Sequence, residues 1–140
     1  MLFEAWGWLF SGLIRVWLGE PEVALERIQR AMRLSPHDPH FGNMRGCAAW
    51  AHFMAGRYDD ALSGAEAAVR EQPNLMFAFC VAAASGALGG HLEAAQKAMA
   101  QVRRLDPTLR LSNLRAFFPT RRAADFARWE EGLRLAGLPD

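Results

Sequence analysis

The chain has 140 residues, of which 51% are hydrophobic and 22% are charged, and its formal net charge is +1. This length and composition are those of a single globular domain with a buried core. The near-neutral charge does not favour nucleic acid binding, and even the most basic region, residues 103–140, has eight arginines against five acidic residues, a charge of +3. We therefore expect no nucleic acid partner.

Cysteine usage and hydropathy indicate where the chain resides. Cys47 and Cys80 stand in no CxxC or zinc spacing, which is typical of a reduced, cytoplasmic protein. The apolar N-terminal region has an uncharged run over residues 5–14, about half of the ~20 residues that span a bilayer. It also lacks the basic segment and cleavage site of a signal peptide. The sequence predicts a cytoplasmic location and no membrane partner.

A pattern of small residues and Pro recurs three times along the chain. In the central copy, Gly56 ends one helix, Tyr58 wedges between helices and Pro73 closes the unit, while the alanines between them allow close helix packing. The equivalent Gly19 and Gly90 lie 37 residues before and 34 residues after Gly56. A period near 34 residues is that of a paired-helix repeat. The sequence therefore predicts an all-α solenoid.

Helical periodicity and Gly or Pro boundaries locate the helices in chain order. The six repeat helices are expected over residues 3–18, 21–34, 41–55, 58–71, 75–88 and 92–105. They group into repeats over about 3–36, 41–73 and 75–107, within one domain spanning 1–140. The three extra residues of the first interval should start the first helix of the second repeat one turn early, near Phe41.

After residue 107 the repeat pattern stops. A short helix is expected over 112–118 and a last helix from 120 or 121 to 135, with Gly137 as its terminator. The apolar residues of the last helix fall on one stripe, formed by Phe126, Trp129, Leu133 and Ala136. A repeat array needs its last apolar face covered, so we interpret residues 108–140 as a C-terminal cap.

The repeat pattern resembles the tetratricopeptide superfamily over residues 2–107. Four phrases, SGLIRVWLGEP (11–21), RAMRLSPHDPHFG (30–42), AHFMAGRYDDA (51–61) and SNLRAFFPTRRAADFARWEEGLRLAGLP (112–139), also resemble the C-terminal repeat region of rhizobial class III adenylate/guanylate cyclase-like proteins. Related proteins carry a winged-helix DNA-binding domain instead of the cyclase. No cyclase metal-binding carboxylate or nucleotide loop matches any position, so this resemblance implies a sensory or scaffolding array and no cyclase activity.

The tetratricopeptide resemblance implies a partner-binding groove on the first helix of each repeat. Its positions are Trp6, Leu9, Phe10, Leu13, Trp17, Asn43, Cys47, Trp50, Met54, Phe77, Cys80, Val81 and Ala84. Chaperone-binding members use Lys, Arg and Asn there to hold a terminal carboxylate. Leu13 and Trp17 replace that chemistry, so we expect no carboxylate clamp and a partner held by apolar contacts.

The aromatic residues of the first helix could instead serve the core or a homodimer. Aromatic residues at helical spacing are more often core than binding surface. An uncovered helix that carries Trp6, Phe10 and Trp17 would also leave an apolar patch larger than soluble monomers usually tolerate. Self-association through this helix, giving a homodimer, removes that patch, and a charged residue at Trp17 or Phe10 should then disrupt the dimer.

No catalytic, cofactor or metal site is expected. His37 and His40 flank Asp38 in a turn, but no helical HxxxH spacing and no cysteine in register accompany them. No serine has a His–acid arrangement near it, and no phosphate-binding loop is present. The sequence predicts a non-catalytic module that binds a protein partner or itself. The alternative is a regulatory fragment of a cyclase-like or transcription-regulator protein that binds a small effector between Trp17, Trp50 and Phe77.

Overall fold

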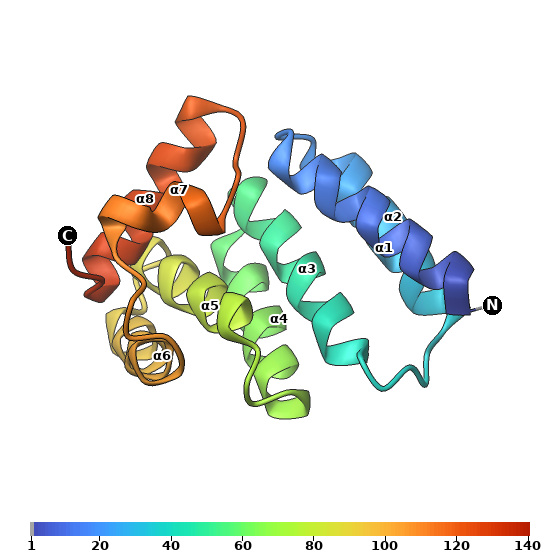
Figure 1. The fold of residues 1–140 in the computed structure, drawn as a ribbon, viewed down its shortest axis with the longest axis horizontal. Helices are drawn as coiled ribbons and strands as arrows, with labels where there is room; N and C mark the ends of the chain where they lie inside the picture. Colours follow the sequence, from blue (N-terminus) through green and yellow to red (C-terminus); the bar gives the residue numbers. More distant parts are fainter. Residues whose placement is uncertain (1) are drawn as a thin grey trace.

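The computed structural model describes residues 2–140, and their regular structure is entirely helical (Figure 1). The elements are α1 (Leu2–Trp17), α2 (Pro21–Leu34), α3 (Phe41–Met54), α4 (Tyr58–Glu71), α5 (Met76–Leu88), α6 (Leu92–Leu105), the 3₁₀ helix η1 (Leu111–Asn113), α7 (Leu114–Phe117) and α8 (Ala123–Ala136). The helices α1 to α6 begin and end within one residue of the predicted bounds. The predicted all-α class is correct.

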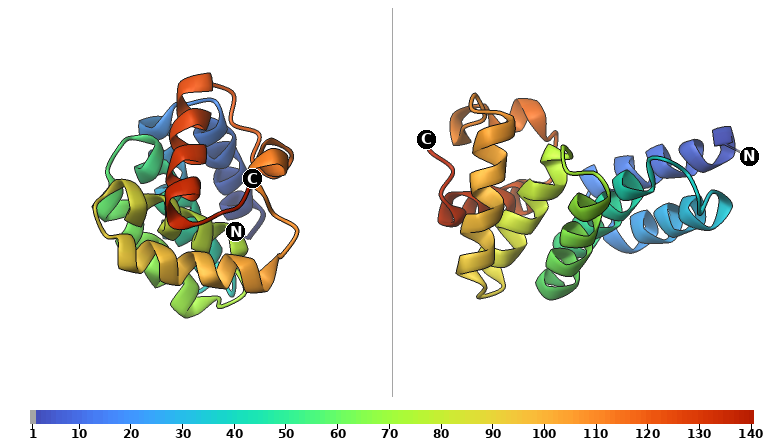
Figure 2. Two further views of the ribbon diagram at one scale, coloured as in Figure 1. Left: turned by 90° about the vertical axis from the view of Figure 1, so that its left-hand side faces the viewer. Right: turned by 90° about the horizontal axis from the view of Figure 1, so that it is seen from below.

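Three helix pairs, α1/α2, α3/α4 and α5/α6, stack in chain order into a short solenoid (Figures 1 and 2). The helix α3 begins at Phe41, but the expected extra turn is wrong. Instead, most of the extra residues lie in the α2–α3 loop, which has six residues against four in the α4–α5 loop. The buried Asp38 stabilises this longer loop, since its carboxylate accepts hydrogen bonds from the His40 N–H at 2.7 Å and the Ser35 hydroxyl at 3.3 Å.

The turn inside each pair uses the repeated glycine. Gly19, Gly56 and Gly90 have φ of 79°, 82° and 84°, in the left-handed region that favours glycine. A Cβ at Gly56 or Gly90 would meet no atom within 4 Å, whereas at Gly19 it would lie 2.6 Å from Cδ of Arg122. Gly19 is therefore packed against the C-terminal part of the chain, whereas Gly56 and Gly90 face open space.

The C-terminal segment, residues 108–140, returns across the solenoid. The expected helix over 112–118 appears as η1 followed by α7, and α8 begins at Ala123, slightly later than predicted. Between them runs an irregular strap, residues 118–122, which passes the end of α1 (Figure 1). There the backbone N–H of Arg121 donates a 2.8 Å hydrogen bond to the carbonyl oxygen of Trp17. The strap thus links the two ends of the array.

The last helix, α8, packs chiefly against α5, the first helix of the third pair. Contact is close because Gly132 has no side chain: a Cβ there would lie 2.9 Å from Cβ of Ala84. All four residues of the predicted apolar stripe on α8 are buried, and Trp129 reaches as far as Phe53 near the end of α3, with ring centroids 5.2 Å apart. The C-terminal segment therefore covers part of the face that α1, α3 and α5 form, which we call the first-helix face.

Candidate functional site

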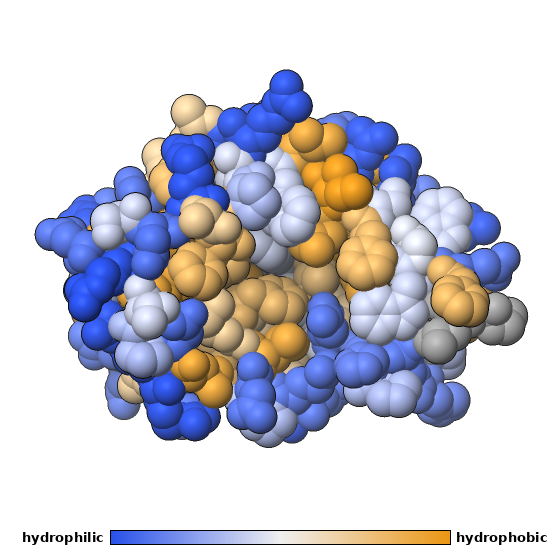
Figure 3. Space-filling model, viewed as in Figure 1, coloured by the Kyte–Doolittle hydropathy of each residue, from blue (hydrophilic) through white to orange (hydrophobic). Residues whose placement is uncertain are grey.

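The part of the first-helix face that α8 leaves uncovered contains a hollow of about 270 Å³ between α1, α3 and the C-terminal segment. Its lining is Trp6, Leu9, Phe10, Leu13, Trp17, Asn43, Cys47, Trp50, Phe77, Phe117 and Phe118. We call this cavity the aromatic hollow. Figure 3 shows apolar side chains gathered around the centre of this face, with hydrophilic residues toward its edges.

The helix α1 supplies one wall of the aromatic hollow. Trp6 packs against Phe10 and against the edge of His40, with ring centroids 5.7 and 5.6 Å apart, so its ring is fixed by the α2–α3 loop. Phe10 keeps 55% of its surface exposed. At the other end of the helix, Trp17 meets Trp50 of α3 edge to face at 6.5 Å. This wall is an aromatic surface, as in many binding sites.

Trp50 lies at the base of the aromatic hollow and contacts aromatic residues from α1, α5 and the C-terminal segment. Its ring lies 5.7 Å from Phe77, 5.4 Å from Phe118 and 5.4 Å from Trp129. The indole N–H groups of Trp17 and Trp50 are buried and have no hydrogen-bond acceptor in the described chain.

The polar chemistry of the aromatic hollow is limited to Asn43 and Cys47. The Cys47 thiol donates to Oδ1 of Asn43 at 3.5 Å. Burial raises the pKa of Cys47 to about 12, so the sulfur is a neutral thiol at physiological pH and is neither a nucleophile nor a good metal ligand. Burial likewise raises the pKa of Cys80. Residues 2–140 contain no cluster of three His, Cys, Asp or Glu side chains able to hold a metal ion.

The structure brings nine of the thirteen predicted groove residues together around the aromatic hollow. The other four, Met54, Cys80, Val81 and Ala84, are buried in the core, and Ala84 lies directly beneath α8. They are not accessible to a partner in this conformation. Sequence reasoning missed Phe117 and Phe118, which close the aromatic hollow from the C-terminal side. The adjacent aromatic pair before Pro119 was the only local signal for them.

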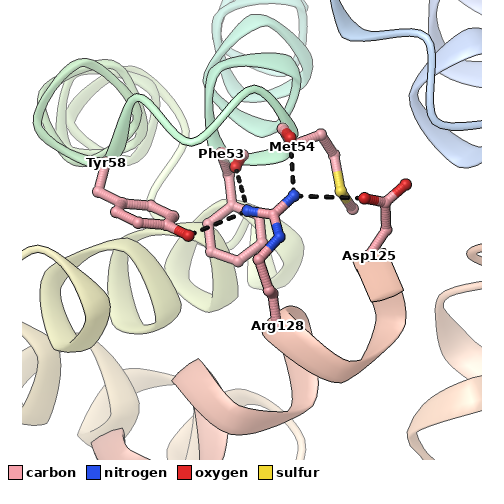
Figure 4. Close-up of polar contacts among 5 residues, drawn as sticks. All are labelled: Phe53, Met54, Tyr58, Asp125 and Arg128. Carbon is pink, nitrogen blue, oxygen red and sulfur yellow. Dashed lines mark hydrogen bonds and ion pairs between the residues drawn. The ribbon is translucent and has the colours of Figure 1, made fainter. Parts of the chain in front are cut away.

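An arginine on α8 holds the covered part of the first-helix face closed (Figure 4). The Arg128 guanidinium donates to the carbonyl oxygens of Phe53 at 3.2 Å and Met54 at 2.7 Å, and to the Tyr58 hydroxyl at 3.0 Å. Asp125 of the same helix accepts a further bond at 3.3 Å. The Phe53 carbonyl oxygen also accepts a 2.9 Å hydrogen bond from the Gly56 backbone N–H, so Arg128 is a second donor there and a donor to the last carbonyl of α3 at Met54. The positive charge of Arg128 also interacts favourably with the negative end of the α3 dipole.

A second, more open depression of about 550 Å³ adjoins the aromatic hollow and shares Trp17 with it. It is lined by Ile14, Trp17, Leu18, Arg115, Pro119, Thr120 and Arg121. Two arginines and no carboxylate contribute to its surface, so this end of the first-helix face is basic.

Further features bear on the class of function. No helix within residues 2–140 is long and apolar enough to cross a membrane. The serine nearest the core, Ser85, is fully buried on α5, and its hydroxyl has no hydrogen-bond partner in the described chain, so no base activates it. The chemistry displayed by this face is that of apolar contact with a basic edge.

Comparison with known proteins supports the fold. No family model matches the sequence, and no curated protein is found as a relative. Among solved structures, the chain is similar to the first tetratricopeptide domain of Spaghetti (RPAP3), solved bound to the HSP90 peptide SRMEEVD. The TM-score is 0.71 at 18% identity, over 97% of this chain and 92% of that one. The chain therefore has the tetratricopeptide fold: three helix pairs and a C-terminal segment that caps them.

Proposed function

We propose that this chain is a non-catalytic protein-interaction module that binds a segment of a partner protein in the aromatic hollow. The observation that carries the proposal is an aromatic cavity left open on the first-helix face, while the neighbouring part of that face is covered by α8. The tetratricopeptide domain of RPAP3, which has the same fold, was solved with a bound peptide. Aromatic side chains that remain partly exposed in a preformed cavity are typical anchors for a partner.

Selection from a displayed library of random peptides tests this proposal with a matched pair of variants. Phe10 lines the aromatic hollow, whereas Phe3 lies on the same helix, is 91% exposed and lines no part of it. We expect wild type and Phe3→Asp to enrich a common set of peptides and Phe10→Asp to lose it. Failure of the wild type to enrich any peptide, or an equal loss with both variants, would contradict the proposal.

A second copy of the chain is an alternative occupant of the same face. Phe3, Phe10 and Ile14 recur along one side of α1 and are all largely exposed, which supports self-association through this helix. Light scattering after size exclusion tests it. A dimer that becomes monomeric with Phe10→Asp supports this alternative, and a monomeric wild type at high micromolar concentration rules it out.

A small effector is a further alternative occupant, and one observation favours it. Trp17, Trp50 and Phe77, the three residues expected to form an effector pocket, all line the aromatic hollow. In this case the chain would be a regulatory part of a cyclase-like or transcription-regulator signalling protein, as the sequence phrases suggest. Tryptophan fluorescence titrated with a panel of metabolites tests it, since an effector in contact with Trp17 and Trp50 must change their emission. An unchanged spectrum across the panel would argue against it.

A further inference from the structure

We propose that the partner segment is acidic, with its large apolar side chains in the aromatic hollow and its carboxylates paired with Arg115 and Arg121 beside the end of α1. This inference rests on the proposed function and deepens it, because it assigns the chemistry of the partner. Its basis is the arrangement of charge around the two adjoining cavities.

The charged lining of the two cavities consists of arginine alone. The aromatic hollow contributes Asn43 as its only amide side chain, and the adjoining depression contributes Arg115, Arg121 and Thr120. No Asp or Glu lines either cavity. A partner segment that extends from the aromatic hollow past Trp17 therefore meets a positive field with no compensating carboxylate.

Neither arginine is engaged by another charge. The ion pairs of residues 2–140 use other arginines, and the side chains of Arg115 and Arg121 form no hydrogen bond within that part of the chain. Elsewhere on the molecule, Arg15, Arg45 and Arg57 each pair with a carboxylate. The two arginines beside the end of α1 are thus available to a ligand.

A contact within the chain positions the guanidinium of Arg115 and the backbone of Arg121. The guanidinium carbon of Arg115 lies 3.9 Å from the centre of the Phe126 ring, a cation–π contact that holds the group while leaving its N–H donors for another partner. The backbone of Arg121 is tied to the end of α1 by its hydrogen bond to the Trp17 carbonyl oxygen. A planar guanidinium on an anchored backbone is suited to two parallel hydrogen bonds to a carboxylate.

The positions also give the segment a direction. Phe10 and Trp6 lie toward the start of α1, and the two arginines lie at its end, with Trp17 between them. The apolar anchors of the partner would therefore occupy one end of the bound segment and its carboxylates the other.

The experiment compares peptides selected on the intact wild-type chain with those selected on Arg121→Glu and on the double variant Arg115→Glu/Arg121→Glu. Arg104→Glu is the control, because Arg104 is exposed on α6 and lines neither cavity. Circular dichroism and thermal melting verify that each variant is folded. The single variant Arg121→Glu keeps the test valid if loss of the Arg115 contact with Phe126 unsettles the fold.

We expect wild type and Arg104→Glu to enrich peptides that combine aromatic or large aliphatic residues with Asp or Glu at one end. Synthetic copies with Gln and Asn for the acidic residues should bind about 10-fold more weakly, and the loss should shrink at high salt. Copies with Lys in those places should prefer Arg121→Glu. Apolar peptides without acidic residues would overturn this inference while leaving the proposed function in place, and the absence of any enriched peptide would overturn both.

Discussion

Over α5 and the end of α3, the first-helix face is covered by α8, whereas over α1 and the start of α3 it is open. Both halves are rich in aromatic and apolar side chains. In the covered half Trp129 is fully buried, and in the open half Phe10 and Phe117 keep 55% and 40% of their surface exposed. Coverage therefore depends on where the C-terminal segment is anchored, at Arg128 and at the strap, and not on a difference in hydrophobicity between the halves.

Replacing Trp129 by alanine should have the largest effect on stability. Its indole is fully buried among Trp50, Phe53 and Phe118, so its removal leaves a cavity at the centre of the covered half. We expect a loss of about 3–5 kcal/mol in the free energy of unfolding, measured by urea denaturation. The matched change Phe10→Ala, in the open half, should cost less than about 1 kcal/mol. Equal losses would mean that the two halves do not differ in burial.

Removal of the Arg128 guanidinium should come next. The change Arg128→Met keeps the apolar stem but leaves the Phe53 and Met54 carbonyl oxygens without this partner. We expect a loss of about 2–3 kcal/mol, since hydrogen bonds from a charged donor are among the stronger ones. Arg134→Met is the control on the same helix, where the exposed pair with Glu131 is screened by solvent and its loss should leave the free energy of unfolding nearly unchanged. An equally small loss at Arg128 would show that α8 is held by apolar packing alone.

Alanine substitutions at two of the repeat glycines, Gly56 and Gly19, compare an open position with one that contacts the C-terminal segment, and the difference in stability between them should be smaller. Ala at Gly56 adds only the left-handed backbone strain, about 1–2 kcal/mol. At Gly19 the new methyl group would also press on Arg122 and on Oδ2 of Asp125, 2.7 Å away, so we expect about 1 kcal/mol more. Thermal unfolding of both variants measures the difference. Identical shifts in Tm would indicate that the C-terminal segment does not rest on the first turn in solution.

The smallest effect on stability is expected from Phe117→Ser, at the edge of the aromatic hollow. Because its side chain is partly exposed and its one aromatic contact is with Phe118 at 6.5 Å, the free energy of unfolding should change by about 0.5 kcal/mol or less. The affinity for selected peptides should nevertheless fall several-fold. A large loss of stability with unchanged affinity would place Phe117 in the core and outside the binding site.

The sequence-based predictions are more accurate for the repeat helices than for the C-terminal segment. Helices α1 to α6 follow from local signals, because Gly19, Gly56 and Gly90 and the prolines that follow each pair set the helix ends. The length of the α2–α3 loop was not predicted, because the turn that Asp38 stabilises produces no periodic pattern in the sequence.

The path of the C-terminal segment could not be obtained from local pattern. Its anchors join residues far apart in the chain: Arg128 donates to carbonyls 74 and 75 residues earlier, and Arg121 to Trp17. A carbonyl acceptor carries no sequence signature, because every residue has one. For this reason four predicted groove residues are in the core, and Phe117 and Phe118 were absent from the predicted site.

The indole N–H signals of the five tryptophans test the central claim most directly, namely that a partner binds the open half of the first-helix face. They are recorded by ¹⁵N–¹H NMR with and without a selected acidic peptide and assigned by single Trp→Phe changes. We predict that the signals of Trp6 and Trp17 shift, because both line the aromatic hollow, while that of Trp8, which packs beneath Arg30 of α2, stays in place. A shift of Trp8 with Trp6 and Trp17 unchanged would contradict the account.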